Sequence, residues 1–222
     1  MKKFLSIMAL AGAVLAFNSC KKGEEDPFLS FKSRDNRIQG EWLLDNVQIT
    51  KETITLNRTP QGAESRVKST RTYSFSKDDP GSVVDVTMLN GAETNNQTRP
   101  LISSDVTLTI NADGTYSSKD SVEFNIRGEI LNFKNKVTGQ WIWGNSKKNK
   151  AAINFTSSSS NNDENSSDFS NPLILGDFNV VALKADQLKL EQNYSTNYFE
   201  SSDLAGATEI TVISNVVATF RK

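Results

Sequence analysis

The segment VTLTINADGTYS, residues 106–117, decides the fold class of this chain. Val106, Leu108 and Ile110 alternate with threonines, which gives a strand one apolar and one polar side. The tetrapeptide NADG at residues 111–114 is a turn signal, and the strand pattern resumes at Thr115. The segment therefore predicts a β-hairpin that turns one side toward a core.

The same alternation recurs on both sides of this hairpin, for instance in residues 84–88, 122–126 and 210–212. Turn signals separate about ten to twelve short strands, and no stretch has a convincing helical period. The pattern predicts an all-β fold: an antiparallel up-and-down β-barrel, with a β-sandwich as the alternative. Four polar stretches are predicted to be loops, namely Arg58–Ser69, Asn90–Pro100, Thr156–Asn171 and Glu191–Gly206.

The N-terminal segment has the layout of a secretory signal. Lys2 and Lys3 form a basic start, and an apolar run from Phe4 to Phe17 follows. This run of about 14 residues is shorter than the roughly 20 that a membrane-spanning helix needs. The run leads to Cys20, which is the only cysteine in the chain. An ordinary signal peptide that happens to contain a cysteine is the alternative interpretation.

The sequence FNSC at residues 17–20 resembles the lipobox of bacterial lipoproteins. Ser19 and Cys20 match the lipobox pattern, whereas Phe17 and Asn18 depart from it. The resemblance implies a signal peptide over residues 1–19 and a Cys20 that carries fatty acyl chains of the palmitate type. Two or more such chains hold a protein durably on a membrane.

A charged segment, KKGEEDP at residues 21–27, follows the cysteine. It resembles the lysine-then-acidic export signal of surface-exposed lipoproteins in some Gram-negative bacteria, and a solvated linker is the alternative. Residues 20–39 are predicted to be the lipidated cysteine and its tether. Four apolar residues of the tether are candidates to pack onto the folded domain that follows, namely Phe28, Leu29, Phe31 and Ile38. The resemblance implies attachment to the outer membrane.

Composition narrows the classes of function. The chain has 25 Lys+Arg, 26 Asp+Glu and no histidine. Loss of Lys2 and Lys3 with the signal peptide leaves 23 basic and 26 acidic residues, which is no electrostatic footprint for nucleic acid. Without histidine there is no Ser–His nucleophile, and an acylated Cys20 leaves no thiol for zinc. We expect no metal, no cofactor and no enzymatic activity.

The segment Gly40-Glu41-Trp42 on the first predicted strand, followed by a meander of hairpins, resembles the lipocalin-like lipoproteins of Gram-negative bacteria. The resemblance implies one barrel domain over residues 40–222. It also implies that Trp42 packs near a basic residue of the last strand, for which Arg221 is the candidate through a cation–π contact. Gly139-Gln140-Trp141 repeats the motif. The chain departs from lipocalins because it lacks a visible C-terminal helix and disulfides, and has long Ser/Asn-rich stretches.

Three functions are compatible with this sequence. The first is a membrane-anchored barrel that binds a small apolar or amphipathic ligand, and the candidate lining residues are Trp141, Trp143, Phe124 and Tyr116. Plain core packing is the alternative for each of these. The second is an interaction, adhesion or accessory protein of an outer-membrane assembly, with a filled barrel and an exposed patch of Tyr194, Tyr198 and Phe199. The third is a hydrolase with two convergent carboxylates. We predict the first.

Overall fold

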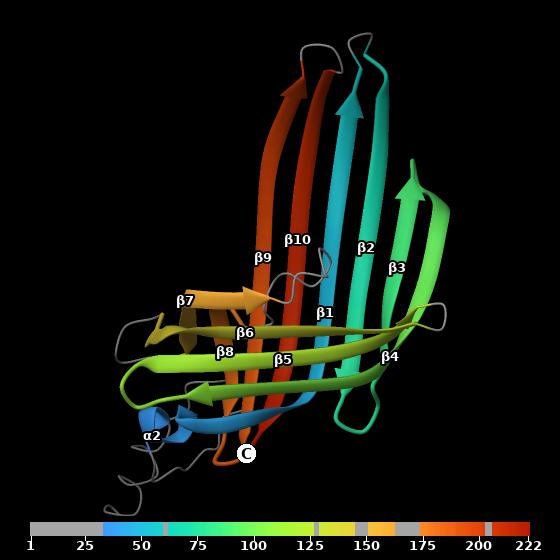
Figure 1. Ribbon diagram of the computed structural model, residues 1–222. Helices are drawn as coiled ribbons and strands as arrows, with labels where there is room; N and C mark the ends of the chain where they lie inside the picture. The colour runs from blue at the N-terminus through green and yellow to red at the C-terminus, as the bar shows by residue number, and fades with distance from the viewer. Residues whose placement is uncertain (1–32, 60–61, 127–128, 145–150, 163–173, 203–205) are drawn as a thin grey trace, which may run out of the picture.

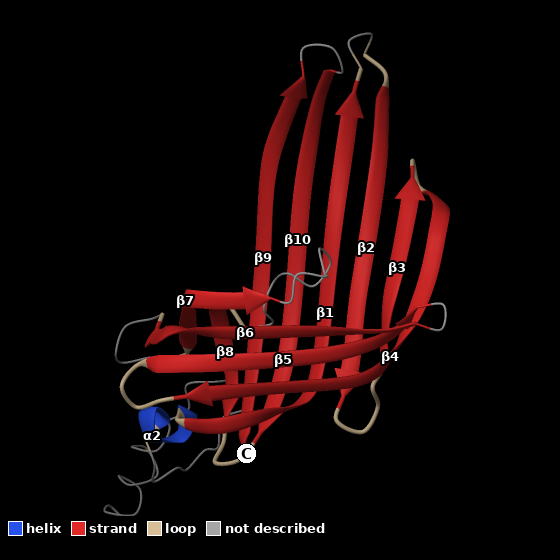
Figure 2. Ribbon diagram, in the orientation of Figure 1, coloured by secondary structure: helices blue, strands red, loops and turns tan. Residues whose placement is uncertain are grey.

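The computed structural model describes residues 33–59, 62–126, 129–144, 151–162, 174–202 and 206–222, which form one short helix and ten strands (Figures 1 and 2). Within these ranges no helix has the length and apolar character needed to cross a membrane. The elements are α2 (Arg34–Ile38), β1 (Gly40–Arg58), β2 (Glu64–Ser76), β3 (Ser82–Leu89), β4 (Ala92–Ile110), β5 (Thr115–Ile126), β6 (Glu129–Trp143), β7 (Ala152–Asn162), β8 (Gly176–Leu183), β9 (Gln187–Ser202) and β10 (Gly206–Arg221).

The strands form a closed antiparallel ring in which each strand pairs with its neighbours in sequence, and β10 closes the ring on β1. This confirms the predicted all-β, up-and-down barrel. The hairpin at 106–117 also forms: Gly114 has φ +86°, and Asp113 Oδ1 accepts a hydrogen bond of 2.9 Å from the backbone N of Thr115. The turn chemistry of the sequence therefore sets the local register of β4 and β5.

The ring has a narrow and a wide end because β1 has two partners on one side. Its first residues, Gly40–Leu43, pair with Thr107–Ile110 of β4, and from Asn46 onward it pairs with β2. At the narrow end eight strands therefore close without β2 and β3. We call this part the barrel body. Eight strands enclose an interior of the size that side chains can fill.

Beyond the body, six strands continue as a single sheet in the order β9-β10-β1-β2-β3-β4. Strand β8 pairs with β9 only up to Glu191, and β5 pairs with β4 only from Leu101. Figure 1 shows β9, β10, β1 and β2 rising far above the layer of β5, β6 and β7. We call this part the extension, which consists of residues 50–58, 64–72, 84–89, 92–99, 192–202 and 206–215.

The hydrophobic core lies in the body. Its largest fully buried side chains include Trp42, Tyr116, Phe155, Phe178 and Phe220. In the extension, by contrast, none of the side chains that the structure describes is buried. The extension is therefore a sheet with solvent on both faces.

Most of the predicted loops are strands of this open sheet, so those predictions are wrong. Strand β4 includes most of Asn90–Pro100, β9 and β10 take up most of the described part of Glu191–Gly206, and β2 begins within Arg58–Ser69. Residues 156–162 of the predicted loop Thr156–Asn171 belong to β7, and the rest of that stretch lies outside the described residues. The reason is physical: a strand with no buried side does not alternate apolar and polar residues.

The folded domain begins before Gly40, inside the predicted tether. Ser33 caps α2 by accepting a hydrogen bond of 3.2 Å from the backbone N of Asn36, and Ile38 is fully buried as expected. Arg34 and Arg37 are buried with it. The predicted signal peptide, Cys20 and the three predicted packing residues Phe28, Leu29 and Phe31 lie outside the described residues.

Candidate functional site

The narrow end of the body is closed by Trp42, α2 and the last residue of the chain. Trp42 Nε1 donates a hydrogen bond of 2.7 Å to the backbone O of Ile38. Lys222 Nζ lies 4.3 Å from the centre of the Trp42 ring and donates to the backbone O of Arg37 (2.9 Å) and of Gln39 (2.7 Å). Trp42 and Ile38, both fully buried, pack together at this end.

The cation over Trp42 is therefore Lys222, and the prediction of Arg221 in this role is wrong. Side chains alternate along β10, so the buried Phe220 points into the barrel and Arg221 points out. Arg221 instead forms an ion pair with Asp45, at 2.9 Å between Nε and Oδ2. Gly40 has φ +124°, and a Cβ at this position would lie 3.2 Å from Lys222 Cε, which explains the glycine of the motif.

The second Gly-x-Trp motif, Gly139-Gln140-Trp141, also has a structural role in packing the body. Trp141 Nε1 donates to the backbone O of Asn111 (2.9 Å), and the Trp141 and Trp143 rings meet edge-on at 5.8 Å. Trp143 Nε1 in turn donates to Asp35 Oδ1 at 2.7 Å, which ties β6 to α2. A Cβ at Gly139 would lie 1.9 Å from the backbone O of Thr156, so β6 approaches its neighbour too closely for any other residue.

Tyr116 lies in the core beside these residues. Its ring packs edge-on against Phe155 at 4.9 Å, and its exposed fraction is 2%. The hydroxyl is buried without a hydrogen-bond partner in the described part of the chain. Burial, together with the negative charge of Asp120, raises the pKa of Tyr116 to about 12.

A cavity of about 710 Å³ lies farther along the barrel, where the body meets the extension. Tyr116, Trp141 and Trp143 do not line it, and the side chain of Phe124 lies outside the described residues. Tyr116, Trp141 and Trp143 are thus part of the packed end, so their prediction as lining residues is wrong. The apolar lining consists of Ile49, Phe75, Leu101, Val106, Val122, Leu175, Val212 and Val216.

A few polar groups interrupt this apolar wall. Asp120 is nearly buried, and its Oδ1 accepts a hydrogen bond of 2.8 Å from Ser118 Oγ. Gln192 Nε2 is used to hold the start of β8, since it donates to the backbone O of Leu175 (3.1 Å) and of Asp177 (3.2 Å). The remaining polar lining residues are Lys51, Tyr73, Asn135, Asp177, Asn193, Tyr194 and Ser214.

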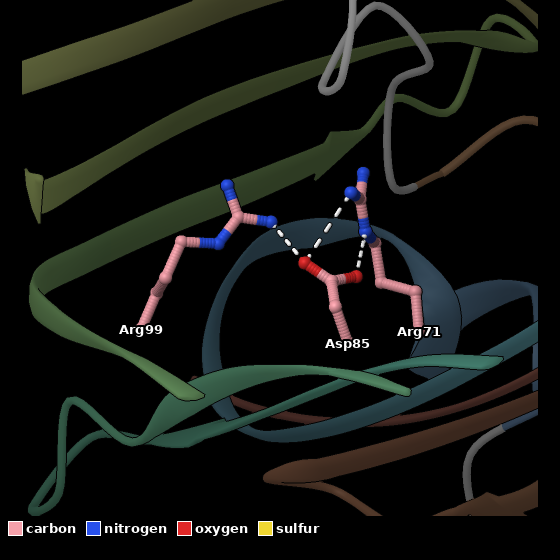
Figure 3. Close-up of polar contacts among 3 residues, drawn as sticks. All are labelled: Arg71, Asp85 and Arg99. Atoms are coloured by element: carbon pink, nitrogen blue, oxygen red, sulfur yellow. Dashed lines mark hydrogen bonds and ion pairs between the residues drawn. The ribbon is translucent and has the colours of Figure 1, made fainter. Parts of the chain in front are cut away.

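A second, polar hollow of about 410 Å³ lies on the same inner face of the extension, and Lys51 lines both hollows. Within it Asp85 lies between Arg71 and Arg99, as Figure 3 shows. Arg71 Nε forms an ion pair with Asp85 Oδ1, and Arg99 Nη2 forms one with Oδ2. Burial opposes the charge of Arg71, but its hydrogen bond to Asp85 and the neighbouring Tyr73 hold its pKa above the ordinary value.

The described residues contain no cluster of three or more His, Cys, Asp or Glu side chains that is able to hold a metal ion. The aromatic residues predicted to form one exposed patch are divided between two faces. Tyr194 and Tyr198 share the inner face of β9, whereas the strongly exposed Phe199 points to the opposite side.

Comparison with known proteins adds little to this picture. No protein-family model matches the chain, and no curated protein does. Among solved structures, the β-barrel of the InvG secretin domain from the Salmonella SPI-1 injectisome is matched at 8% identity and a TM-score of 0.18. The match covers 82% of this chain and 61% of that one.

Proposed function

We propose that this protein is a non-enzymatic, membrane-anchored lipoprotein whose lipocalin-like barrel binds a small apolar or amphipathic ligand. The observation that carries the proposal is the cavity of about 710 Å³ with its eight apolar lining residues. Ligand sites are commonly mostly apolar hollows of about 300–1,000 Å³ with a few placed polar groups. The body is filled at its narrow end and hollow at its wide end, which suits a barrel that holds one ligand.

The position of α2 supports the proposed anchor. The chain enters the domain at the narrow end, and the extension rises on the other side of the body (Figure 1). A tether from Cys20 to Ser33 reaches about 45 Å at most, because an extended chain spans roughly 3.3–3.6 Å per residue. Acyl chains on Cys20 would therefore keep the packed end within about 45 Å of the outer membrane.

A Cys20→Ala variant tests the anchor. We expect the parent protein to sediment with membranes and the variant to appear in the soluble fraction, because it lacks the acyl chains. The matched control is Ser19→Ala, which keeps the cysteine. A Cys20→Ala protein that still sediments in full would refute the lipoprotein proposal.

Ligand binding is tested by filling the cavity. Val122 lines the cavity from β5, so Val122→Trp occupies space that a ligand needs. We expect at least a tenfold loss of affinity for the apolar dye N-phenyl-1-naphthylamine, measured by its fluorescence on the chain from residue 20 with Cys20→Ser. The control Ile142→Trp places the same side chain at a position that is 62% exposed. Equal dye binding by the parent and both variants would contradict the proposal.

An interaction or adhesion function is the second candidate, and the extension is the observation that favours it. Its exposed strand β9 has no described partner on its outer side beyond Glu191, and such an edge can pair with another strand. The hollow body and the divided aromatic residues favour the ligand-binding function over this one. Loss of a co-purifying protein after shortening of the extension would reverse that order.

A further inference from the structure

The inner face of β1–β4 changes character in successive rows of paired residues. The row nearest the core contains Ile49, Tyr73 and Val83, paired across β1, β2 and β3, and it ends at Arg99 of β4. The next row contains Lys51, Arg71, Asp85 and Gln97. The row after that contains Thr53, Ser69, Thr87 and Asn95. Because residues two apart on a strand share a face, the three rows form one surface that runs from apolar through charged to hydroxyl and amide groups.

The charged row and the adjacent Arg99, which line the polar hollow together, have more cations than anions. Arg71 and Arg99 share the single carboxylate of Asp85, and Lys51 adds a third positive charge beside Arg71. Lys51 forms no ion pair with any residue that the structure describes. The Nε of Arg99 is also buried without a hydrogen-bond partner among these residues. The polar hollow therefore has two positive charges in excess.

This excess of positive charge lies where the apolar tail of an amphipathic ligand would meet its polar head group. Lys51 lines the apolar cavity on one side and the polar hollow on the other. A tail that fills the space beside Ile49, Phe75 and Val216 would thus end next to the Lys51 ammonium. The buried carboxylate of Asp120 also lines the cavity, on β5, and repels an anion from the deeper part. The charges of the lining favour one orientation, with the anionic group at the extension.

We infer that the ligand is a single-chain amphiphile with an anionic head group, a carboxylate or a phosphate monoester, whose head is held by Lys51, Arg71 and Arg99 at the mouth of the cavity. The inference rests on the proposed ligand-binding function. Guanidinium groups bind carboxylate and phosphate through paired N–H donors, and Lys adds a point charge. The hydroxyl and amide row beyond it offers further donors to the head group.

The test compares ligands that differ only in the head group. Laurate, dodecyl phosphate and dodecanol are titrated against the chain from residue 20 with Cys20→Ser, below their micelle concentrations, by displacement of N-phenyl-1-naphthylamine. We expect the two anions to bind about tenfold or more tightly than the alcohol, because a charge-assisted contact is retained only with them. Their advantage should fall as salt is raised. Inorganic phosphate serves as the head group without a tail.

Variants assign the effect to the charged row. Lys51→Met keeps the apolar stem of the side chain and leaves the Asp85 ion pairs intact, so we expect it to reduce the advantage of laurate over dodecanol. Lys51→Arg should restore most of the difference. The control is Lys136→Met on the outer face of β6, where the side chain is exposed. A melting curve for each variant verifies that the domain is folded.

The outcomes separate this inference from the function on which it rests. If dodecanol binds as tightly as laurate, the cavity is confirmed and the anionic head group is refuted. If none of the three amphiphiles displaces the dye or binds by calorimetry, both proposals fail. If inorganic phosphate alone binds as tightly as dodecyl phosphate, the polar hollow is an anion site unrelated to the cavity, and the inference is again overturned.

Discussion

Strand β10 passes through two parts of the molecule that are stabilised differently. In the body its residues Ala218 and Phe220 are fully buried, and a large apolar side chain such as Phe220 contributes about 1.5–3 kcal/mol by leaving water. In the extension the described residues of the same strand, 208–215, are at least partly exposed. There stabilisation comes from the backbone ladder and from cross-strand side-chain pairs of roughly 0.2–1 kcal/mol each.

Buried side chains thus determine where the sheet forms, and uninterrupted strand pairing determines how far the sheet extends beyond them. The pairing of β1 with β2 and of β9 with β10 continues from the body into the extension without a register shift. The extension therefore needs no nucleus of its own, because its strands are already aligned by the buried part. An isolated sheet without an apolar face would be marginal in water.

The largest expected effect is the loss of Trp42 from the body. Trp42→Ala removes a fully buried side chain, its hydrogen bond to Ile38 and the ring beneath Lys222. We expect the free energy of unfolding to fall by about 3–5 kcal/mol in urea denaturation. Tyr198→Ala in the extension is the matched control, since its side chain is 43% exposed, and should cost less than about 1 kcal/mol. Equal losses would remove the distinction between the two parts.

Tyr116 gives an intermediate effect that depends on pH. Its folded-state pKa is about 12, above the ordinary value of 10.0, so the folded state keeps the phenol proton after the unfolded state has lost it. Its contribution is thus complete below pH 10 and is lost as the pH rises from 10 through 12, by roughly 2–3 kcal/mol in total. Tyr116→Phe should lack this loss and should be neutral or stabilising at pH 7, because the hydroxyl has no partner among the described residues.

Denaturation of both proteins at pH 7 and at pH 11 measures this difference. The two proteins differ only at residue 116, so the difference between the two curves belongs to Tyr116. Parallel loss of stability in both proteins would mean that the phenol is solvated, and that the body is less tightly packed than its buried residues indicate.

The sequence predicts the body well and the extension poorly, for the same physical reason. The alternation of apolar and polar residues around Val106, Leu108 and Ile110 indicates a strand with one buried side, and all three apolar residues are buried in the structure. Residues 92–99 have no buried side and hence no alternation, so their polar composition suggested a loop. The assignment of Arg221 failed by one residue, because only the register of β10 decides that Lys222 points inward.

The charged row could not be predicted from sequence either. Lys51, Arg71 and Asp85 are far apart in the chain and share a row only through the register of three strands. A period-2 count places each residue on a face of its own strand, but it does not fix which strands become neighbours. Sequence reasoning pointed to aromatic residues as lining, and three of them, Tyr116, Trp141 and Trp143, pack at the narrow end instead.

The smallest expected effect tests whether charge holds the extension together. Glu52 and Lys68 form an ion pair of 2.9 Å on its outer face, with side chains 27% and 36% exposed. Glu52→Gln should lower the free energy of unfolding by less than about 1 kcal/mol, and by less still at high salt. Asp45→Asn, which breaks the surface pair with Arg221 at the body, should have a similar effect. Similar small effects would mean that surface ion pairs contribute equally in the body and in the extension, and that the two parts differ only in the burial of their side chains. A loss of several kcal/mol for Glu52→Gln only, measured in urea at low salt, would instead show that paired charges replace a core in the extension.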